Sequence, residues 1–176
     1  MRNAADFSHV LRFTFYILSL AARVAMMETI FRIATSADIE IVVQFIHEYY
    51  EFDHLPFDEQ VARVALTKFV GDESLGRVWL ISYEDEAVGY LVLTLGYSLE
   101  YGGRDAFIDE VYIRASHRGR GIGQSALAFV EDVCRSLGVR VLHLEVERAN
   151  TSAYGLYRKV GFVDHDRCLM TKRIST

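Results

Sequence analysis

The sequence predicts an α+β fold, which some schemes would class as α/β, built on a mostly antiparallel sheet. The apolar pattern has a helical period in residues 36–70 and changes to an extended-chain period in residues 78–98. The short acidic turn 84–86 joins two strand-like runs there, which is typical of a β-hairpin. Only the strand-helix-strand segment 107–147 is expected to form a parallel crossover.

Apolar spacing, caps and breakers place the individual elements. Thr35 and Asp38 resemble a capping box before the first helix, whose apolar stripe ends at Tyr50. Pro56 breaks that pattern, and Gly71 and Gly138 end later helices. The elements expected in chain order are a strand at 29–35, helices at 36–50 and 58–70, hairpin strands at 78–84 and 87–99, a strand at 106–114, a helix at 122–137, a strand at 139–147, a helix at 151–160 and a last strand at 168–174.

Length and composition predict one globular domain over residues 28–176, because this length suffices for a sizeable core but not for two ordinary domains. The sequence is 51% hydrophobic and 24% charged. Its net charge of −5 argues against a nucleic-acid partner. Acidic residues dominate between Glu28 and Glu100, whereas residues 114–140 are rich in arginine, so an anionic ligand suits the second half.

Residues 1–27 are set apart from this domain. Their apolar core, residues 13–22, is too short to span a bilayer, and we expect no membrane partner. The segment has the outline of a signal peptide, yet Met26 and Met27 stand just before the first convincing strand. We therefore favour a start codon assigned too early, with an export signal or an extra docking helix as alternatives.

The two cysteines, Cys134 and Cys168, lie far apart and indicate neither a disulfide framework nor a zinc site. We expect both to be buried thiols in a reducing compartment, the cytoplasm. His47 and His54 are expected at the surface, because no second pair at ligand spacing accompanies them.

The stretch SHRGRGIGQSA, residues 116–126, places three glycines at alternate positions between an apolar run and an amphipathic helix. Glycine backbone conformations can aim several N–H groups at one point. The first turn of the following helix adds free amides and the positive end of its dipole. The turn therefore predicts a pyrophosphate site, with Arg118 and Arg120 offsetting the charge of the ligand.

The same turn allows other interpretations. A nucleotide-hydrolase phosphate loop requires a lysine, which the stretch lacks. The dinucleotide fingerprint fits residues 121–126, with Glu145 or Glu147 at the end of the next strand. Against it, residues 115–120 separate the preceding strand from the first glycine of that fingerprint, and hairpin strands come before the motif. A tight turn with solvated arginines is the remaining alternative.

Two motifs in the chain resemble those of the GNAT superfamily of N-acetyltransferases. Residues 118–123 match its [Q/R]-x-x-G-x-[G/A] signature, and residues 150–162 match its N-x-x-A-x-x-x-Y-x-x-x-G-F segment. The second motif falls on Asn150, Ala153, Tyr157, Gly161 and Phe162. The resemblance implies a mixed, mostly antiparallel central sheet flanked by helices, with an acetyl-CoA site on a strand-loop-helix-strand unit.

The resemblance implies acetyl-CoA as co-substrate and no metal. Its pyrophosphate would bind the main-chain nitrogens of the glycine turn, and its pantetheine arm would pair with the fourth strand, where that strand splays from the fifth. Asn150 would help to place this arm, or would cap the helix that begins at Thr151. The expected cofactor-binding residues are Val111, Tyr112, Ile113, Arg118, Gly119, Arg120, Gly121, Ile122, Gly123, Gln124 and Asn150.

The resemblance also implies catalytic roles. Tyr157 is the expected general acid for the departing thiolate, and Tyr154 competes for this role. The alternative is that Tyr157 is only an aromatic side chain packed at the edge of the core. For the general base, Asp109 and Glu110 must point to opposite faces of their strand. We favour Glu110, because it shares its face with Tyr112, while Asp109 or a water chain remains open.

The resemblance therefore predicts an N-acetyltransferase that acts on a primary amine by direct attack in a ternary complex. The acceptor would be bound by residues 45–60 and 96–105, whose acids and aromatics suit a cationic small-molecule amine or a lysine side chain. These include Glu48, Tyr49, Glu51, Asp53, Glu100 and Tyr101. The family's habits allow a homodimer. The alternatives are a non-catalytic acyl-CoA-binding sensor on the same fold and a dinucleotide-binding oxidoreductase.

Overall fold

The computed structural model describes residues 28–174, so the predictions for residues 1–27 lie outside the described part. The chain divides into two compact units, one ending at Glu145 and the other beginning at Val146. Within residues 28–174, no helix combines the length and the apolar character needed to cross a membrane.

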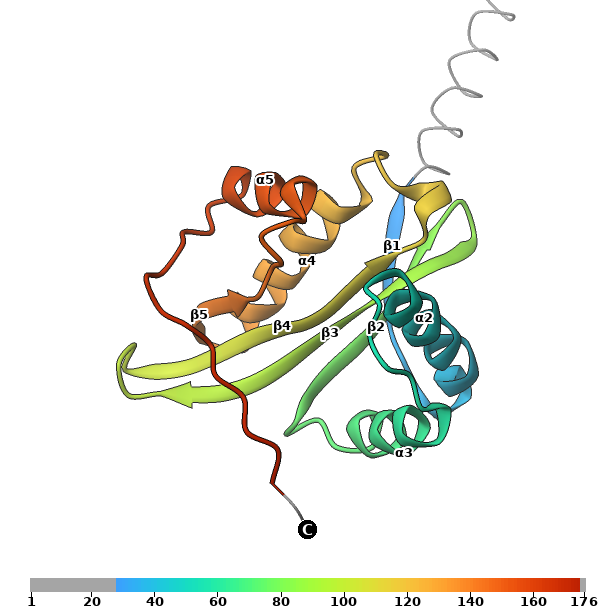
Figure 1. The fold of residues 1–176 in the computed structure, drawn as a ribbon, viewed down its shortest axis with the longest axis horizontal. Coiled ribbons are helices and arrows are strands. Elements are labelled where there is room, and N and C mark those ends of the chain that lie inside the picture. The colour runs from blue at the N-terminus through green and yellow to red at the C-terminus, as the bar shows by residue number, and fades with distance from the viewer. Residues whose placement is uncertain (1–27, 175–176) are drawn as a thin grey trace, which may run out of the picture. The chain divides into compact units, whose positions relative to one another are not determined.

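The first unit is built on a five-stranded sheet whose strands lie side by side in chain order (Figure 1). The strands are β1 (Thr29–Ile33), β2 (Gly76–Tyr83), β3 (Glu86–Ser98), β4 (Gly103–Ile113) and β5 (Val139–Leu144). Neighbouring strands pair antiparallel except β4 and β5, which are parallel. The predicted mixed, mostly antiparallel sheet is thereby confirmed.

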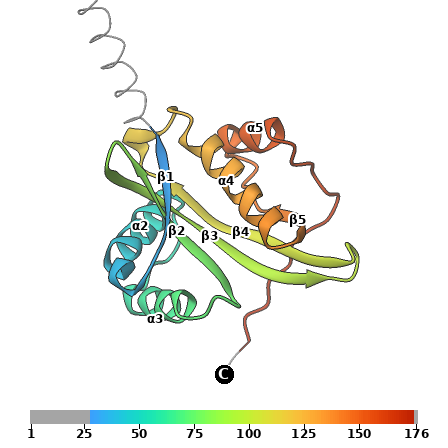
Figure 2. The same cartoon turned by 180° about the vertical axis from the view of Figure 1, so that it is seen from behind.

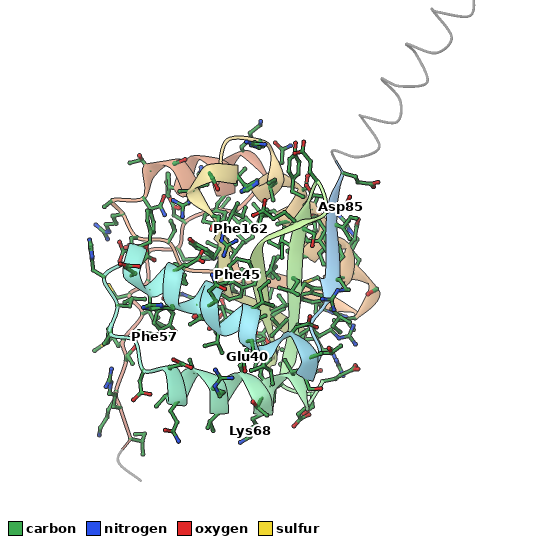
Figure 3. The ribbon with its side chains drawn as sticks, turned by 90° about the vertical axis from the view of Figure 1, so that its right-hand side faces the viewer. Glu40, Phe45, Phe57, Lys68, Asp85 and Phe162 are labelled. Carbon is green, nitrogen blue, oxygen red and sulfur yellow. The ribbon has the colours of Figure 1, made fainter. Side chains whose placement is uncertain are left out.

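Helices α2 (Ile39–Phe52) and α3 (Glu59–Val70) cover one face of this sheet (Figure 1). The predicted capping contact is present: the backbone N–H of Thr35 donates to Oδ2 of Asp38 at 2.8 Å. Phe45 is fully buried between α2 and the strands (Figure 3), with its ring 6.3 Å from the ring centroids of both Tyr90 and Tyr112. This aromatic group anchors α2 over β3 and β4.

Helix α4 (Ile122–Ser136) covers the opposite face of the sheet (Figure 2). Phe129 stacks on Phe31 of β1 at 4.5 Å and meets Trp79 of β2 edge-on at 5.4 Å. The buried residues of α4 are Ile122, Ala126, Leu127, Val130 and Cys134, which repeat with a helical period and confirm the predicted burial of Cys134. This packing fixes the start of α4 at the end of the glycine turn.

The second unit contains α5 (Thr151–Lys159), and residues 160–174 of it form neither helix nor strand. The predicted last strand at 168–174 is therefore wrong. Its short apolar run suggested a strand, but a strand exists only when a neighbour takes up its hydrogen bonds, and no strand among the described residues pairs with it. The predicted burial of Cys168 is also wrong: its side chain is exposed.

Candidate active site

The glycine turn has the conformation that the sequence predicts. Gly119 has φ of +78°, and Gly121, which caps the N-terminus of α4, has φ of +84°. Both values lie in the left-handed region that favours glycine. Apart from the glycine and its two chain neighbours, no atom of residues 28–174 would lie within 4 Å of a Cβ added at either position, so the turn borders open space.

The backbone of this turn presents a run of unused donors. Within residues 28–174, none of the six main-chain nitrogens from Gly119 to Gln124 donates a hydrogen bond. The run is bounded on both sides, because the N–H of Arg118 donates to the carbonyl of Ala115 and that of Ser125 to the carbonyl of Gly121. Free amides at the positive end of a 15-residue helix fit a phosphate or another anion.

The two arginines of the turn contact the chain itself. Nε of Arg118 donates to the carbonyl oxygen of Ile113 at 2.8 Å, and its guanidinium carbon lies 4.2 Å from the ring centroid of Phe52. Nη2 of Arg120 donates to the carbonyl of Ser116 at 3.4 Å. Their positive charge stays beside the turn, but part of their hydrogen-bonding capacity is already used, so their role toward an anionic ligand stays a prediction.

Strand β4 has an unpaired edge next to this turn. β5 pairs only with residues Arg104 to Ile108 of β4, so no described strand pairs with residues 109–113 on that side. The two strands therefore separate as the family resemblance implies. The carbonyl of Ile113 accepts a hydrogen bond from Arg118, whereas within residues 28–174 no side chain donates to the carbonyl of Val111. This edge can accept an extended ligand arm as if it were a further strand.

Glu110 and Asp109 occupy different environments on β4. The register between β3 and β4 shifts at Asp109, which is an extra residue relative to β3 and is exposed. Glu110 faces α2 and accepts hydrogen bonds from the hydroxyls of Tyr50 at 2.9 Å and Tyr90 at 2.6 Å. Burial raises the pKa of the Glu110 carboxyl, and these two phenols act in the opposite direction. Sequence analysis placed Glu110 on the face of Tyr112, and the structure confirms that placement.

Sequence reasoning missed Tyr50 and Tyr90 as partners of Glu110. Tyr90 lies within an apolar run, and a buried phenol needs a hydrogen-bond partner, which was the available signal. Which residue is this partner depends on the register that sets Tyr90 opposite Tyr112 and on the placement of α2 over both strands.

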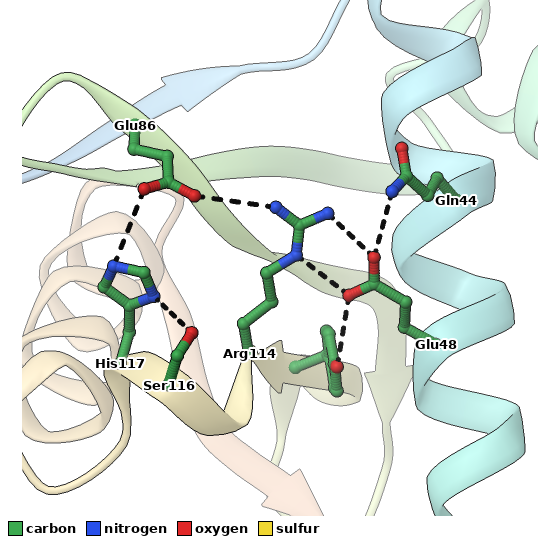
Figure 4. Close-up of polar contacts among 7 residues, drawn as sticks. Gln44, Glu48, Glu86, Arg114, Ser116 and His117 are labelled. Carbon is green, nitrogen blue, oxygen red and sulfur yellow. Dashed lines mark hydrogen bonds and ion pairs between the residues drawn. The ribbon is translucent and has the colours of Figure 1, made fainter.

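Glu48, expected among the acceptor-binding acids, is instead bound by Arg114 (Figure 4). Nη2 and Nε of the arginine donate to the two carboxylate oxygens at 2.7 and 2.9 Å. This guanidinium lowers the pKa of the Glu48 carboxyl. Arg114 also approaches Glu86, which in turn lies 3.8 Å from Nε2 of His117. The carboxylate of Glu48 therefore fastens α2 to the end of β4.

The second unit contains the two remaining predicted site residues. Asn150 caps α5: its side-chain oxygen accepts from the N–H of Ala153 at 3.1 Å. Tyr154 donates to Asp164 at 2.7 Å. Within residues 28–174 no hydrogen bond is formed by the hydroxyl of Tyr157, and burial raises the pKa of this phenol. Of the two tyrosines, Tyr157 has the hydroxyl that remains available for proton transfer.

Two further features are the exposed histidines and one cavity. His47 and His54 are exposed, as predicted, and His47 stacks on Phe57 at 4.6 Å. No group of three or more potential metal ligands occurs among residues 28–174. A cavity of about 420 Å³ is lined by residues such as Ser74, Tyr97 and Arg104. Tyr97 and Arg104 belong to the predicted acceptor segment 96–105, whereas none of the predicted catalytic or cofactor-binding residues lines this cavity.

Comparison with known proteins gives the family. The model of the acetyltransferase (GNAT) family matches residues 40–162. Mouse (Mus musculus) thialysine N-epsilon-acetyltransferase is 28% identical over 149 residues, covering 79% of this chain and 86% of the mouse protein. The uncharacterized N-acetyltransferase YycN of Bacillus subtilis (strain 168) is 33% identical over 91 residues, which cover 52% of this chain and 56% of that protein.

A solved structure agrees with the fold. The crystal structure of an integron cassette protein from the mobile metagenome of Cole Harbour Salt Marsh has a TM-score of 0.74 and 36% identity, and the match covers 83% of this chain and 91% of that one. The family model spans most of the chain and includes the residues of both motifs. This chain therefore belongs to the acetyltransferase (GNAT) family, and the predicted class of enzyme, an acetyl-CoA-dependent acyltransferase, is confirmed.

Proposed function

We propose that the protein transfers the acetyl group of acetyl-CoA to a primary amine by direct attack in a ternary complex. The run of six free main-chain nitrogens from Gly119 to Gln124 supports this most strongly, because it fits a diphosphate and no protein acceptor among the described residues uses it. The unpaired edge of β4 at residues 109–113 suits the amide-bearing arm of the same molecule. When bound, acetyl-CoA supplies the acetyl group as an activated thioester.

Each of the two proposed catalytic residues transfers one proton. A carboxylate oxygen of Glu110 takes a proton from the acceptor, since only the uncharged amine is a nucleophile. The hydroxyl of Tyr157 donates its proton to the departing sulfur. Free N–H groups on β4 polarise the carbonyl under attack, and holding both reactants in one site supplies much of the acceleration. Asp109, which is exposed on the same strand, is the alternative base.

The proposed acceptor is a small-molecule amine or a lysine-like side chain. The name of the mouse relative specifies an amine acceptor, thialysine, which supports this class. Because Glu48 is bound by Arg114, recognition of a cation falls to the other acidic and aromatic residues around the end of α2 and the β3–β4 turn. Among these, Glu51 is exposed, and Asp53 and Tyr101 are partly exposed.

Calorimetry with acetyl-CoA and a thiol-release assay over a panel of amines test this proposal. Heat of binding together with amine-dependent thiol release is the expected result. Binding with no release on any amine favours the acyl-CoA-binding sensor. Thermal stabilisation by NAD(H) or NADP(H), but not by acetyl-CoA, favours the dinucleotide-binding oxidoreductase.

A further inference from the structure

Two phenols from different elements bind the two oxygens of Glu110. The hydroxyl of Tyr50, in the last turns of α2, donates to Oε1 at 2.9 Å. The hydroxyl of Tyr90, in the middle of β3, donates to Oε2 at 2.6 Å. A carboxylate bonded on both oxygens has one fixed orientation, and hydrogen bonds to its charged form favour ionisation.

The charged neighbours of Glu110 along the chain, Asp109 and Arg114, do not bind its carboxylate. Its neighbour Asp109 opposes ionisation. Tyr49 of α2 lies near Tyr90, and Arg114, just after the end of β4, directs its donors to Glu48 instead. The hydroxyls of Tyr50 and Tyr90 thus donate to this carboxylate, one to each oxygen. Removing either hydroxyl takes one of these two hydrogen bonds from the partly buried charge.

The two tyrosines differ in how they are fixed. Tyr90 is fully buried and stacks near Phe45 in the core under α2, so its hydroxyl is part of the core. Tyr50 is half-buried at the edge, and edge-on contacts with the rings of Tyr49 at 5.8 Å and Phe57 at 6.1 Å set its direction. The hydroxyl of Tyr50 can therefore be removed to test its hydrogen bond to Glu110 while the core stays intact.

We propose that Tyr50 is a positioning residue for the catalytic base: with Tyr90, its hydroxyl fixes the Glu110 carboxylate in one orientation and keeps it ionised. This inference rests on the proposed function, in which Glu110 takes the proton of the acceptor amine. Without the Tyr50 hydroxyl, the carboxyl binds its proton more tightly. The base then becomes protonated, and inactive, at a higher pH than in the wild type.

The test measures the pKa of the Glu110 carboxyl by NMR titration of protein carrying ¹³C-labelled glutamate, in the wild type and in Tyr50→Phe. We expect the substitution to raise this pKa by about one unit, because one hydrogen bond to a charged group is lost. The acid limb of the kcat/KM profile should move upward by the same amount. A purely structural role would lower kcat/KM at every pH and leave the limb in place.

Tyr154→Phe is the matched control, because it also removes a phenol–carboxylate bond, the one to Asp164. It should change neither the pKa of Glu110 nor the acid limb. An unchanged Glu110 pKa in folded Tyr50→Phe protein overturns the inference, and this readout does not require activity. Glu110→Gln separates the two claims: if it removes the acid limb while Tyr50→Phe does not move it, only the inference fails. If Glu110→Gln leaves the limb intact, the base assignment fails and the inference with it.

Discussion

Replacing Gly121 by alanine tests the anion site with an internal comparison. Gly121 has φ of +84°, and Gly138, just after α4, has φ of +69°; a Cβ at either position meets no atom within 4 Å. Each substitution therefore introduces the same left-handed strain without a clash, which costs about 1 kcal/mol. For a protein of this size that lowers Tm by about 2–4 °C in both variants.

The two variants should differ only in binding acetyl-CoA. The Cβ at residue 121 projects into the open space beside the free amides, so an approaching phosphate loses about one charge-assisted hydrogen bond, worth about 1.5–3 kcal/mol. We expect the Kd measured by calorimetry to rise about 10- to 100-fold for Gly121→Ala. Gly138→Ala should bind like the wild type. Equal affinities in the two variants, with equal losses of Tm, would refute the reasoning.

Further expected outcomes concern the proposed general acid, the packing of the core and the ion pair between Arg32 and Asp38. Tyr157→Phe should lower kcat about 100-fold while Tyr154→Phe keeps most activity, and equal rates in a steady-state assay would contradict the assignment. Phe45→Ala should cost about 3–5 kcal/mol in urea unfolding, against less than about 1 kcal/mol for the half-exposed Phe52→Ala. Arg32 lowers the pKa of Asp38 in the folded state, so wild-type stability should fall as the pH drops below about 4. Asp38→Asn should flatten that fall and cost about 1–2 kcal/mol at pH 7.

The elements of the first unit could be predicted because local signals determine them. The apolar stripe and glycine stop of α4, and the acidic turn between β2 and β3, depend only on neighbouring residues. The glycine turn was predictable for the same reason, since positive φ at Gly119 and Gly121 is a local requirement. Local chemistry thus predicted both the sheet and the candidate anion site.

The contacts that sequence reasoning missed all join distant segments. The bonds of Glu110 to Tyr50 and Tyr90, and the capture of Glu48 by Arg114, depend on how α2 lies over the sheet. The extra residue at Asp109 depends on pairing between β3 and β4. The strand predicted at residues 168–174 failed for a related reason, because strand formation needs a partner that the segment's own pattern does not specify.

A crystal structure of the protein with coenzyme A bound tests the central claim most directly. The main-chain nitrogens from Gly119 to Gln124 should lie about 2.7–3.2 Å from oxygens of the diphosphate. Coenzyme A bound elsewhere on the protein, with these six nitrogens left without a phosphate oxygen in reach, would contradict the account.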